Sequence, residues 1–266
     1  MKVLFLFILM VLLSLTGSYG QSPAWKTFDT RSSGISLSLH WMQLNDMHFS
    51  PLRYNGPGGE LKIVSIRSYD EIRRYFSVGG RADYLWNSLG FNSIYVQPEF
   101  VFGLTRRIEG LSGEKAFSYL GGGINATSRI YRFLNEDPDH IYWATSYMTE
   151  LHYIYDIAIG DNRKALVELK LPLAGIISRP AVGNHYNYQL PGFVEYAKRL
   201  HENPQFATWY NMQGANLLLL AELSSSRRSS VSVGYELDFA RFSEPAPAIY
   251  FFNSVFIRIF YDVFVW

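Results

Sequence analysis

The stretch that decides the fold is residues 230–240, SVSVGYELDFA, together with residues 253–263, NSVFIRIFYDV. In the first segment every even position is small or charged, while every odd position from Val231 to Phe239 is apolar or aromatic. In the second segment Ser254, Arg258 and Asp262 alternate with apolar residues. A period of two is typical of a β-strand with one apolar face. Residues 243–247, SEPAP, predict a turn, so the two segments form a hairpin.

The first 20 residues predict a secretory signal peptide. Lys2 precedes an apolar run at residues 3–15, and small residues at Ser18 and Gly20 favour cleavage before Gln21. The alternative, an uncleaved membrane anchor, is disfavoured because a spanning helix needs roughly 17 apolar residues. We expect one domain over residues 21–266. The chain has no Cys, which excludes a Cys-linked lipid anchor and a disulfide framework.

The composition favours a membrane barrel. Hydrophobic residues make up 48% of the chain and aromatic residues 17%, yet the longest apolar run after the signal, residues 217–221, is far too short for a membrane helix. A barrel needs this composition because its strands face lipid only at every second residue. A net charge of +1 offers no basic field, so we expect no nucleic-acid partner.

Period-two alternation recurs in eight further segments, which brings the expected strands to ten. Pro98 lies within one of them and predicts a bulge. The segments are residues 34–44, 60–68, 75–86, 93–105, 117–132, 143–159, 165–176 and 207–223.

The expected links alternate between short and long. Short links at 69–73, 107–115, 160–163 and 225–229 lie at one end, and the other end includes 45–59 and the long segment 178–205. A secreted β-sandwich or lipocalin-like barrel would also alternate, but with its apolar face inward. The link pattern, the strand number and the aromatic residues at strand ends favour the membrane barrel over this soluble alternative. Those aromatic residues are Trp41, Tyr84, Trp86, Trp143 and Trp209.

These features, with the ending IRIFYDVFVW at residues 257–266, resemble the small outer-membrane β-barrel proteins of Gram-negative bacteria. The resemblance implies that Phe264 and Trp266 are an assembly signal, and that the barrel assembly machinery and outer-membrane lipid are partners. The usual pattern would place Arg258 on the lipid face, at a cost of about 2–4 kcal/mol near the bilayer midplane. We therefore expect Arg258 inside, with a bulge or changed register near the end.

The polar faces of the strands predict a lumen filled by charges of both signs. Ten strands enclose little more space than eight, so these groups should pair and plug the barrel, which disfavours a general porin. A narrow channel for a small solute stays open as an alternative. The expected lumen residues are Arg67, Arg81, Asp83, Glu99, Arg129, Glu150, His152, Asp156, Glu168, Lys170, Glu236, Asp238, Arg258 and Asp262, with His40 beside them.

Barrels of this class include phospholipases, lipid A modifying enzymes and proteases, which makes a lipid-acting hydrolase of the phospholipase or lipid A deacylase type the first alternative, ahead of the channel. His152 with Glu150 and Asp156 is a candidate base with an orienting carboxylate, and His40 shares its face with nearby serines. The strand directions place His152 far from the outer rim, so no catalytic residue is assigned. No acid or His spacing is typical of a metal site, and no cofactor is expected.

The long segment 178–205 is the candidate binding region. Apolar residues at helical spacing predict a short amphipathic helix over residues 193–201. This helix is either a lid or a contact surface for a protein or glycan partner. The candidate contacts are His185, Tyr186, Tyr188, Phe193 and Tyr196. We thus expect a ten-stranded closed antiparallel barrel in the outer membrane, both termini periplasmic, with a structural, binding or accessory-subunit role.

Overall fold

The computed structural model describes residues 30–47, 50, 52–69, 71–112, 115–134, 141–159, 163–180, 198, 200–225, 229–244 and 246–262. The predicted signal peptide, the aromatic candidates in the long link, most of the predicted helix, and Phe264 with Trp266 lie outside these residues. In the part of the chain that is described, no helix is long and apolar enough to cross a bilayer.

Nearly all of the described chain is β-strand. The strands are β1 Thr30–Asp46, β2 Tyr54–Tyr69, β3 Ile72–Trp86, β4 Asn92–Arg107, β5 Ala116–Phe133, β6 Ile141–Ile159, β7 Arg163–Ser178, β8 Pro204–Thr208, β9 Met212–Ser225, β10 Ser229–Phe242 and β11 Ala248–Asp262; one 3-10 turn, η1, spans Glu109–Leu111.

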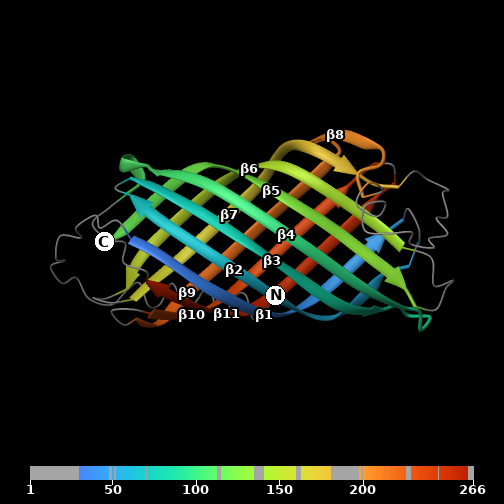
Figure 1. The fold of residues 1–266 in the computed structure, drawn as a ribbon, viewed down its shortest axis with the longest axis horizontal. Coiled ribbons are helices and arrows are strands. Elements are labelled where there is room, and N and C mark those ends of the chain that lie inside the picture. The colour runs from blue at the N-terminus through green and yellow to red at the C-terminus, as the bar shows by residue number, and fades with distance from the viewer. Residues whose placement is uncertain are drawn as a thin grey trace.

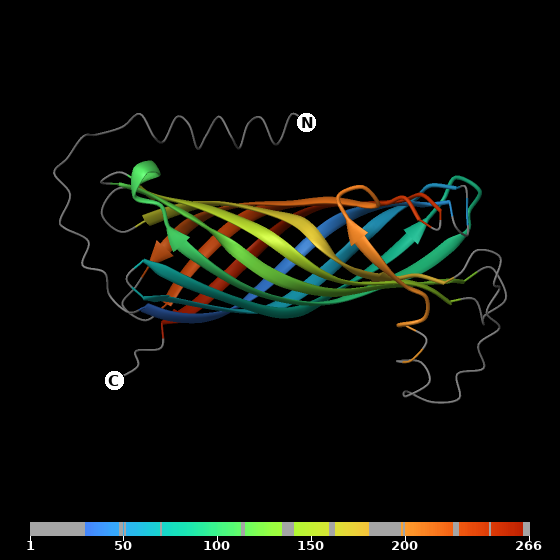
Figure 2. The same ribbon diagram turned by 90° about the horizontal axis from the view of Figure 1, so that it is seen from above.

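The strands form a closed antiparallel barrel (Figures 1 and 2). Sequential strands pair with each other, and β11 pairs with both β10 and β1, which closes the sheet. The short β8 and the long β9 both pair with β7, at different heights, so they share one position in the wall. The barrel therefore has ten positions, as the sequence predicts.

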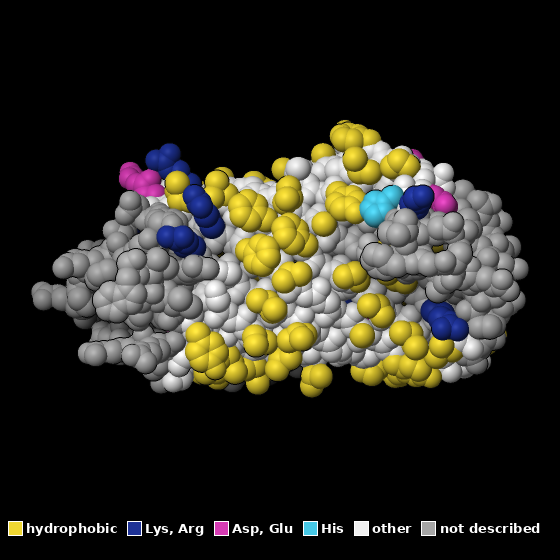
Figure 3. Space-filling view, in the orientation of Figure 1, with side chains coloured by type: hydrophobic (Ala, Val, Ile, Leu, Met, Phe, Trp, Pro, Cys, Tyr) yellow, Lys and Arg dark blue, Asp and Glu magenta, His cyan; other side chains and the backbone are white. Residues whose placement is uncertain are grey.

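The apolar faces of the strands point outward and the polar faces inward. Leu37, Leu61 and Ile257 are more than half exposed, while Lys62 and Arg81 are buried. Hydrophobic side chains accordingly spread over the outer wall in Figure 3. A soluble barrel has the opposite arrangement, so this one is built to face lipid. The fold and its exterior point to the outer membrane.

The links at the two ends of the barrel differ in length. One end carries residues 70–71, 108–115, 160–162 and 226–228, and the other carries residues 179–203 as its longest link. We call these the short-turn end and the long-link end. The long link predicted at 178–205 is confirmed, but the expected link over 45–59 is wrong, because β2 begins at Tyr54 and leaves residues 47–53, fewer than 108–115 at the short-turn end.

Two expectations about the strands are wrong. Pro98 lies opposite Gly80 without any shift between β3 and β4, because a missing N–H removes one ladder bond without adding a residue. Shifts occur instead at Thr149/Glu150 and at Val231/Ser232. The segment 207–223 is two strands rather than one.

The expectation for the end of the chain is tested only as far as Asp262. Arg258 does face inward, 5% exposed, as expected, but the register of β11 runs unbroken to Asp262. Arg258 already has the inward parity of Ser254, so within the described residues no bulge is needed to place it inside.

The aromatic residues at the strand ends divide into two groups. Trp41 and Trp86 are exposed and in contact, with ring centroids 5.7 Å apart, and Tyr84 packs beside Trp86. Trp209 is half exposed, whereas Trp143 is only 2% exposed. Trp143 is therefore not one of the lipid-facing aromatic residues that the sequence predicts.

Candidate functional site

The centre of the lumen is organised around Lys62, on β2. Its ammonium nitrogen lies 3.0 Å from Glu60, 3.1 Å from Glu99 and 3.6 Å from Glu236, three carboxylates contributed by β2, β4 and β10. All four side chains are at most 13% exposed. A single cation thus links strands from distant parts of the chain across the barrel.

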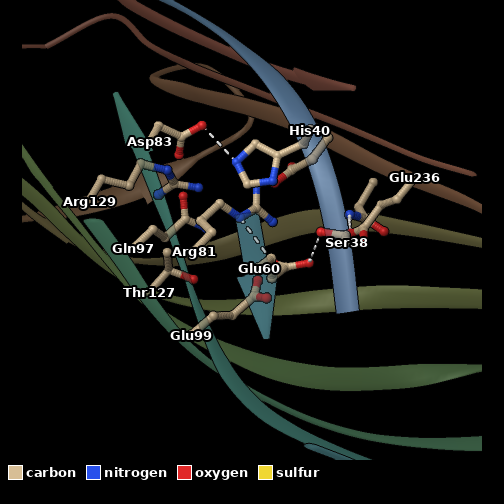
Figure 4. A network of polar contacts seen from close by, with 12 residues as sticks. Ser38, His40, Glu60, Arg81, Asp83, Gln97, Glu99, Thr127, Arg129 and Glu236 are labelled. Carbon is tan, nitrogen blue, oxygen red and sulfur yellow. Dashed lines mark hydrogen bonds and ion pairs between the residues drawn. The ribbon is translucent and has the colours of Figure 1, made fainter. Parts of the chain in front are cut away.

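Arg81 on β3 extends this network toward the long-link end. It donates from Nε to Glu60 at 3.1 Å and from Nη1 to Asp238 at 3.2 Å, and its guanidinium stacks over the Phe252 ring. His40 lies beside it and meets Asp83 at 2.7 Å. Figure 4 shows Arg81 with Glu60 and His40 with Asp83, contributed by neighbouring strands.

His152 on β6 occupies a recess formed by strand glycines. A Cβ on Gly103 would lie 2.6 Å from the His152 ring, and a Cβ on Gly123 2.7 Å from it. The imidazole Nε2 meets Glu150 at 3.2 Å, and Asn125 donates to the same carboxylate at 2.9 Å. Glycine is needed at these β4 and β5 positions because any side chain would displace the ring.

The long-link end of the lumen is closed by an aromatic layer. The members come from the ends of several strands, and most of their side chains are almost fully buried. The layer comprises Met42, Leu44, Tyr54, Leu85, Tyr95, Tyr131, Phe133, Tyr142, Phe242, Tyr250 and Phe252.

A buried ion pair ties this layer to the links above it. Arg179, just after β7, meets Asp46 at 2.8 and 3.0 Å, and Tyr131 and Tyr250 donate to the same carboxylate. Arg179 also donates to the carbonyls of Glu244 and Ala246. Although burial opposes its charge, the carboxylate of Asp46 raises the pKa of Arg179, so the guanidinium stays charged.

The short-turn end has its own polar and apolar contacts. Arg73 pairs with Asp156, and Arg258 lies over the rings of Phe256 and Phe260. A small apolar cluster of Val64, Tyr75, Val101 and Phe260 separates this end from the centre. The lumen is thus filled in layers along its length.

Most residues predicted for the lumen do line it. The structure brings Arg81, Glu99, Glu236 and Asp238 together in the central network, and His152 meets Glu150 beside it. Glu168 pairs with Lys170 nearby, and Arg129 donates to Ser146. Asp262 lies on β11, but its side chain is outside the described residues.

The main error lies on β2. Val64 and Ile66 pack inside, so Arg67 falls on the outward parity with Leu61 and Ile63. The same error hid Glu60 and Lys62, because the alternation of residues 60–68 was assigned to the wrong face. The sequence did contain a sign of the correct face. Leu61 and Ile63 are apolar and share their face with Ser65 and Arg67, so that face is the lipid face in spite of its two polar residues.

The catalytic candidates do not assemble into a hydrolytic site among the described residues. His152 is fully buried, and Asp156 pairs with Arg73 rather than with His152. Ser38 shares a face with His40 but donates to Glu60. The described residues also contain no group of three or more His, Asp or Glu side chains placed to hold a metal ion.

A small cavity remains beside the central network. It has a volume of about 50 Å³ and is lined mostly by polar side chains, among them Lys62, Glu99, Glu150, Lys170, Glu236 and Asp238. This volume accommodates about three or four water molecules.

The comparisons with known proteins identify the fold of this chain and nothing more specific. A scan against protein-family models finds no match, and neither does a search of curated proteins. Among solved structures, the outer membrane protease OmpT from Escherichia coli aligns over 88% of this chain and 97% of its own, with a TM-score of 0.53 and 9% identity. The translocator domain of autotransporter NalP from Neisseria meningitidis (89% of each chain, TM-score 0.42, 8% identity) and Ail from Yersinia pestis (89% of this chain and 100% of that, TM-score 0.32, 9% identity) align less well. At such identities the likeness shows the fold alone.

Proposed function

We propose that this chain, a closed barrel of the Gram-negative outer-membrane type, stands in the outer membrane as a non-conducting protein with a structural, binding or accessory-subunit role. The observation that carries the proposal is the filled lumen. The aromatic layer, the central ion network and the apolar cluster at the short-turn end follow one another along the barrel axis.

The aromatic layer opposes conduction because it offers a hydrated ion few polar contacts. A selectivity filter replaces water with rings of carbonyls or of charges of one sign. Here Tyr54, Leu85, Phe133 and Phe242 are at most 2% exposed and pack against other side chains, and the two central tyrosine hydroxyls are already bonded to Asp46. An ion would have to displace these groups and break their hydrogen bonds.

The central network opposes conduction for a second reason. Its charges have both signs and are in direct contact, so they satisfy each other rather than a passing solute. Buried pairs of this kind are costly to separate, since each partner would be left uncompensated. The lumen is therefore a rigid interior. We expect the surfaces that contact partners to lie at the two ends of the barrel and on its outer wall.

The remaining parts of the proposal follow from the sequence. Export would use the signal peptide before Gln21, and assembly would use Phe264 and Trp266. With an even number of wall positions both termini lie at the short-turn end, which we assign to the periplasm. The long link, with His185, Tyr186, Tyr188, Phe193 and Tyr196, would then face outward and supply contacts to a protein or glycan partner.

The test is the conductance of the folded mature chain in a planar lipid bilayer. Insertion is verified independently, by flotation with vesicles and by the shift in electrophoretic mobility on boiling. We expect no single-channel steps. Discrete steps from the inserted wild-type chain would overturn the non-conducting role in favour of a narrow channel.

The same vesicles test the hydrolase alternative. We expect no release of fatty acid from phospholipid or lipid A. Release that is lost in the His152→Ala variant would replace the proposed role with an enzymatic one, since His152 beside Glu150 is the candidate base that the sequence offers.

A further inference from the structure

Two arginines lie side by side on the outer wall near the short-turn end. Arg67 on β2 and Arg74 on β3 are register partners. Arg74 has the outward parity of the exposed Phe76, and Arg67 has that of the exposed Ile63. Directly opposed side chains on one face have Cβ atoms about 4.5–5.5 Å apart. Figure 3 shows basic side chains at this end of the hydrophobic wall. Both cations therefore face the surroundings of the barrel from one spot.

Other polar groups extend this spot onto the neighbouring strands. Ser65 shares the outward face of β2 with Arg67, and its hydroxyl lies 3.1 Å from that of Ser33 on β1. Arg106 continues the basic surface onto β4, but it is already paired with Glu71 at 3.0 Å. We define the basic patch as Ser33, Ser65, Arg67 and Arg74.

The depth of the basic patch matches one edge of a bilayer. Arg74 and Tyr84 lie ten residues apart on the outward face of β3. A strand rises about 3.3 Å per residue and tilts by about 35–45° in such barrels, so ten residues span about 25 Å along the axis. The apolar band of an outer-membrane barrel has about this height. The outward residues between the two carry no charge; they are Phe76, Val78, Gly80 and Ala82.

The two edges of this sector differ in chemistry. Trp41, Tyr84 and Trp86 form an aromatic group at the edge near the long-link end. Aromatic residues are common at both interfaces of such barrels, but here β2 and β3 have arginines at the other edge. An arginine on the lipid face is costly at the midplane and costs little at the interface. The arginines are therefore placed at the level of the lipid headgroups.

An anion between the two arginines would offset their mutual repulsion. Like charges directly opposite each other destabilise a pair of strands. A guanidinium group donates two parallel hydrogen bonds to a phosphate, so two guanidinium groups can hold one phosphate from both sides. The neighbouring serine hydroxyls can donate hydrogen bonds as well. This combination of donors fits a phosphate group.

We propose that the basic patch binds the phosphate of an anionic phospholipid in the periplasmic leaflet. The guanidinium groups of Arg67 and Arg74 hold the phosphate, and the acyl chains lie along the exposed side chains of Ile63 and Phe76. A zwitterionic phospholipid is a weaker ligand, because its own cation neutralises the phosphate. The proposal rests on the membrane setting and on the assignment of the short-turn end to the periplasm, both proposed above.

The experiment is fluorescence quenching by spin-labelled lipid in phosphatidylcholine vesicles. The chain has no Cys, so one introduced Cys can carry the fluorophore. Leu104→Cys places the fluorophore beside the basic patch, because Leu104 is 45% exposed and is the register partner of Arg74. Leu223→Cys is the matched probe, since Leu223 is 55% exposed near the same end of β9, five wall positions from β3.

The quenchers are phosphatidylglycerol and phosphatidylcholine that carry the same nitroxide near the headgroup end of one acyl chain. We expect phosphatidylglycerol to quench the probe at residue 104 more strongly than phosphatidylcholine does. At residue 223 the two lipids should quench equally. The difference at residue 104 measures the local preference for the anionic lipid.

Two variants and one matched control locate the site of this preference. Arg67→Gln or Arg74→Gln should lower the apparent affinity for phosphatidylglycerol at residue 104 about fivefold, as expected for loss of one cation near an anionic headgroup. The double variant should abolish the preference. Arg241→Gln is the control, because Arg241 is an exposed arginine at the long-link end of β10, and it should leave the preference unchanged.

The outcomes separate this site from the membrane role. A preference that is absent, that is equal at both probes, or that survives in the double variant with folding verified by heat shift overturns the site and leaves the membrane barrel standing. Quenching of neither probe by either lipid contradicts the membrane setting itself. If unlabelled lipid A relieves the quenching better than unlabelled phosphatidylglycerol at equal phosphate, the ligand is lipid A and the periplasmic phospholipid is overturned.

Discussion

At the scale of single residues, Lys62 is the group on which the central lumen depends. Replacing it by Met in Lys62→Met would leave Glu60, Glu99 and Glu236 facing one another without their shared cation. Removing one partner of a buried ion pair costs about 3–5 kcal/mol. We expect the urea midpoint of the folded chain, followed by tryptophan fluorescence, to fall accordingly.

Arg106→Met is the control for this prediction. Arg106 also pairs with a carboxylate, Glu71, at 3.0 Å, but its side chain is 76% exposed. Exposed pairs contribute about 0–1 kcal/mol. Equal losses of stability in the two variants would show that the Lys62 network does not stabilise the barrel.

The recess around His152 leads to a second residue-scale prediction. Gly103→Ala places a methyl group 2.6 Å from the imidazole, so we expect a clear loss of stability. In the background of His152→Ala the same change should cost little, because the ring it meets is gone. A double-mutant cycle in urea measures this coupling. Additive losses would mean that the clash is relieved in another way.

At the scale of elements, each strand has a lipid face and a lumen face. Leu37 on β1 is 59% exposed and lies opposite Ile257 of β11. Leu37→Arg should cost about 2–4 kcal/mol in a bilayer, as a charge on the lipid face near the midplane does. The free energy of unfolding from vesicles checks the value.

Leu89→Arg provides the matched change outside the wall. Leu89 is 68% exposed in the turn between β3 and β4, so its substitution exposes no charge to the hydrocarbon core. We expect almost no change in stability. A similar cost for both variants would contradict the assignment of the outer face to lipid.

At the scale of the whole molecule, β11 closes the barrel by pairing with both β10 and β1. Deleting residues 248–262 should therefore abolish the closed form and the mobility shift on boiling that such a form shows. Deleting residues 109–111, the η1 turn outside the wall, should preserve the shift. A heat shift that survives loss of β11 would show that closure does not depend on this strand.

Much of this architecture could be predicted from the sequence, because alternation is local. Residues 93–105 and 230–240 show two clean faces, and both faces are found as predicted. Prediction failed where the local pattern was ambiguous. In residues 60–68 both parities contain apolar residues, so only the neighbouring strands decide that Val64 packs inside. Trp143 was predicted to be a lipid-facing aromatic residue but is buried, because its burial depends on parts of the structure outside its own strand.

Apart from the faces of residues 60–68 and the division of 207–223, the sequence by itself determined the strands, their two faces and the closed barrel, since these follow from a period of two and the link lengths. Only the tertiary structure decided which charges meet. Lys62 reaches Glu236 because closure brings β10 next to β11 and β1, and no spacing along the chain encodes that distance. The aromatic layer and the break in the ladder of β7 arise in the same way, because the stagger between strands sets which side chains share a height in the lumen and which residues pair.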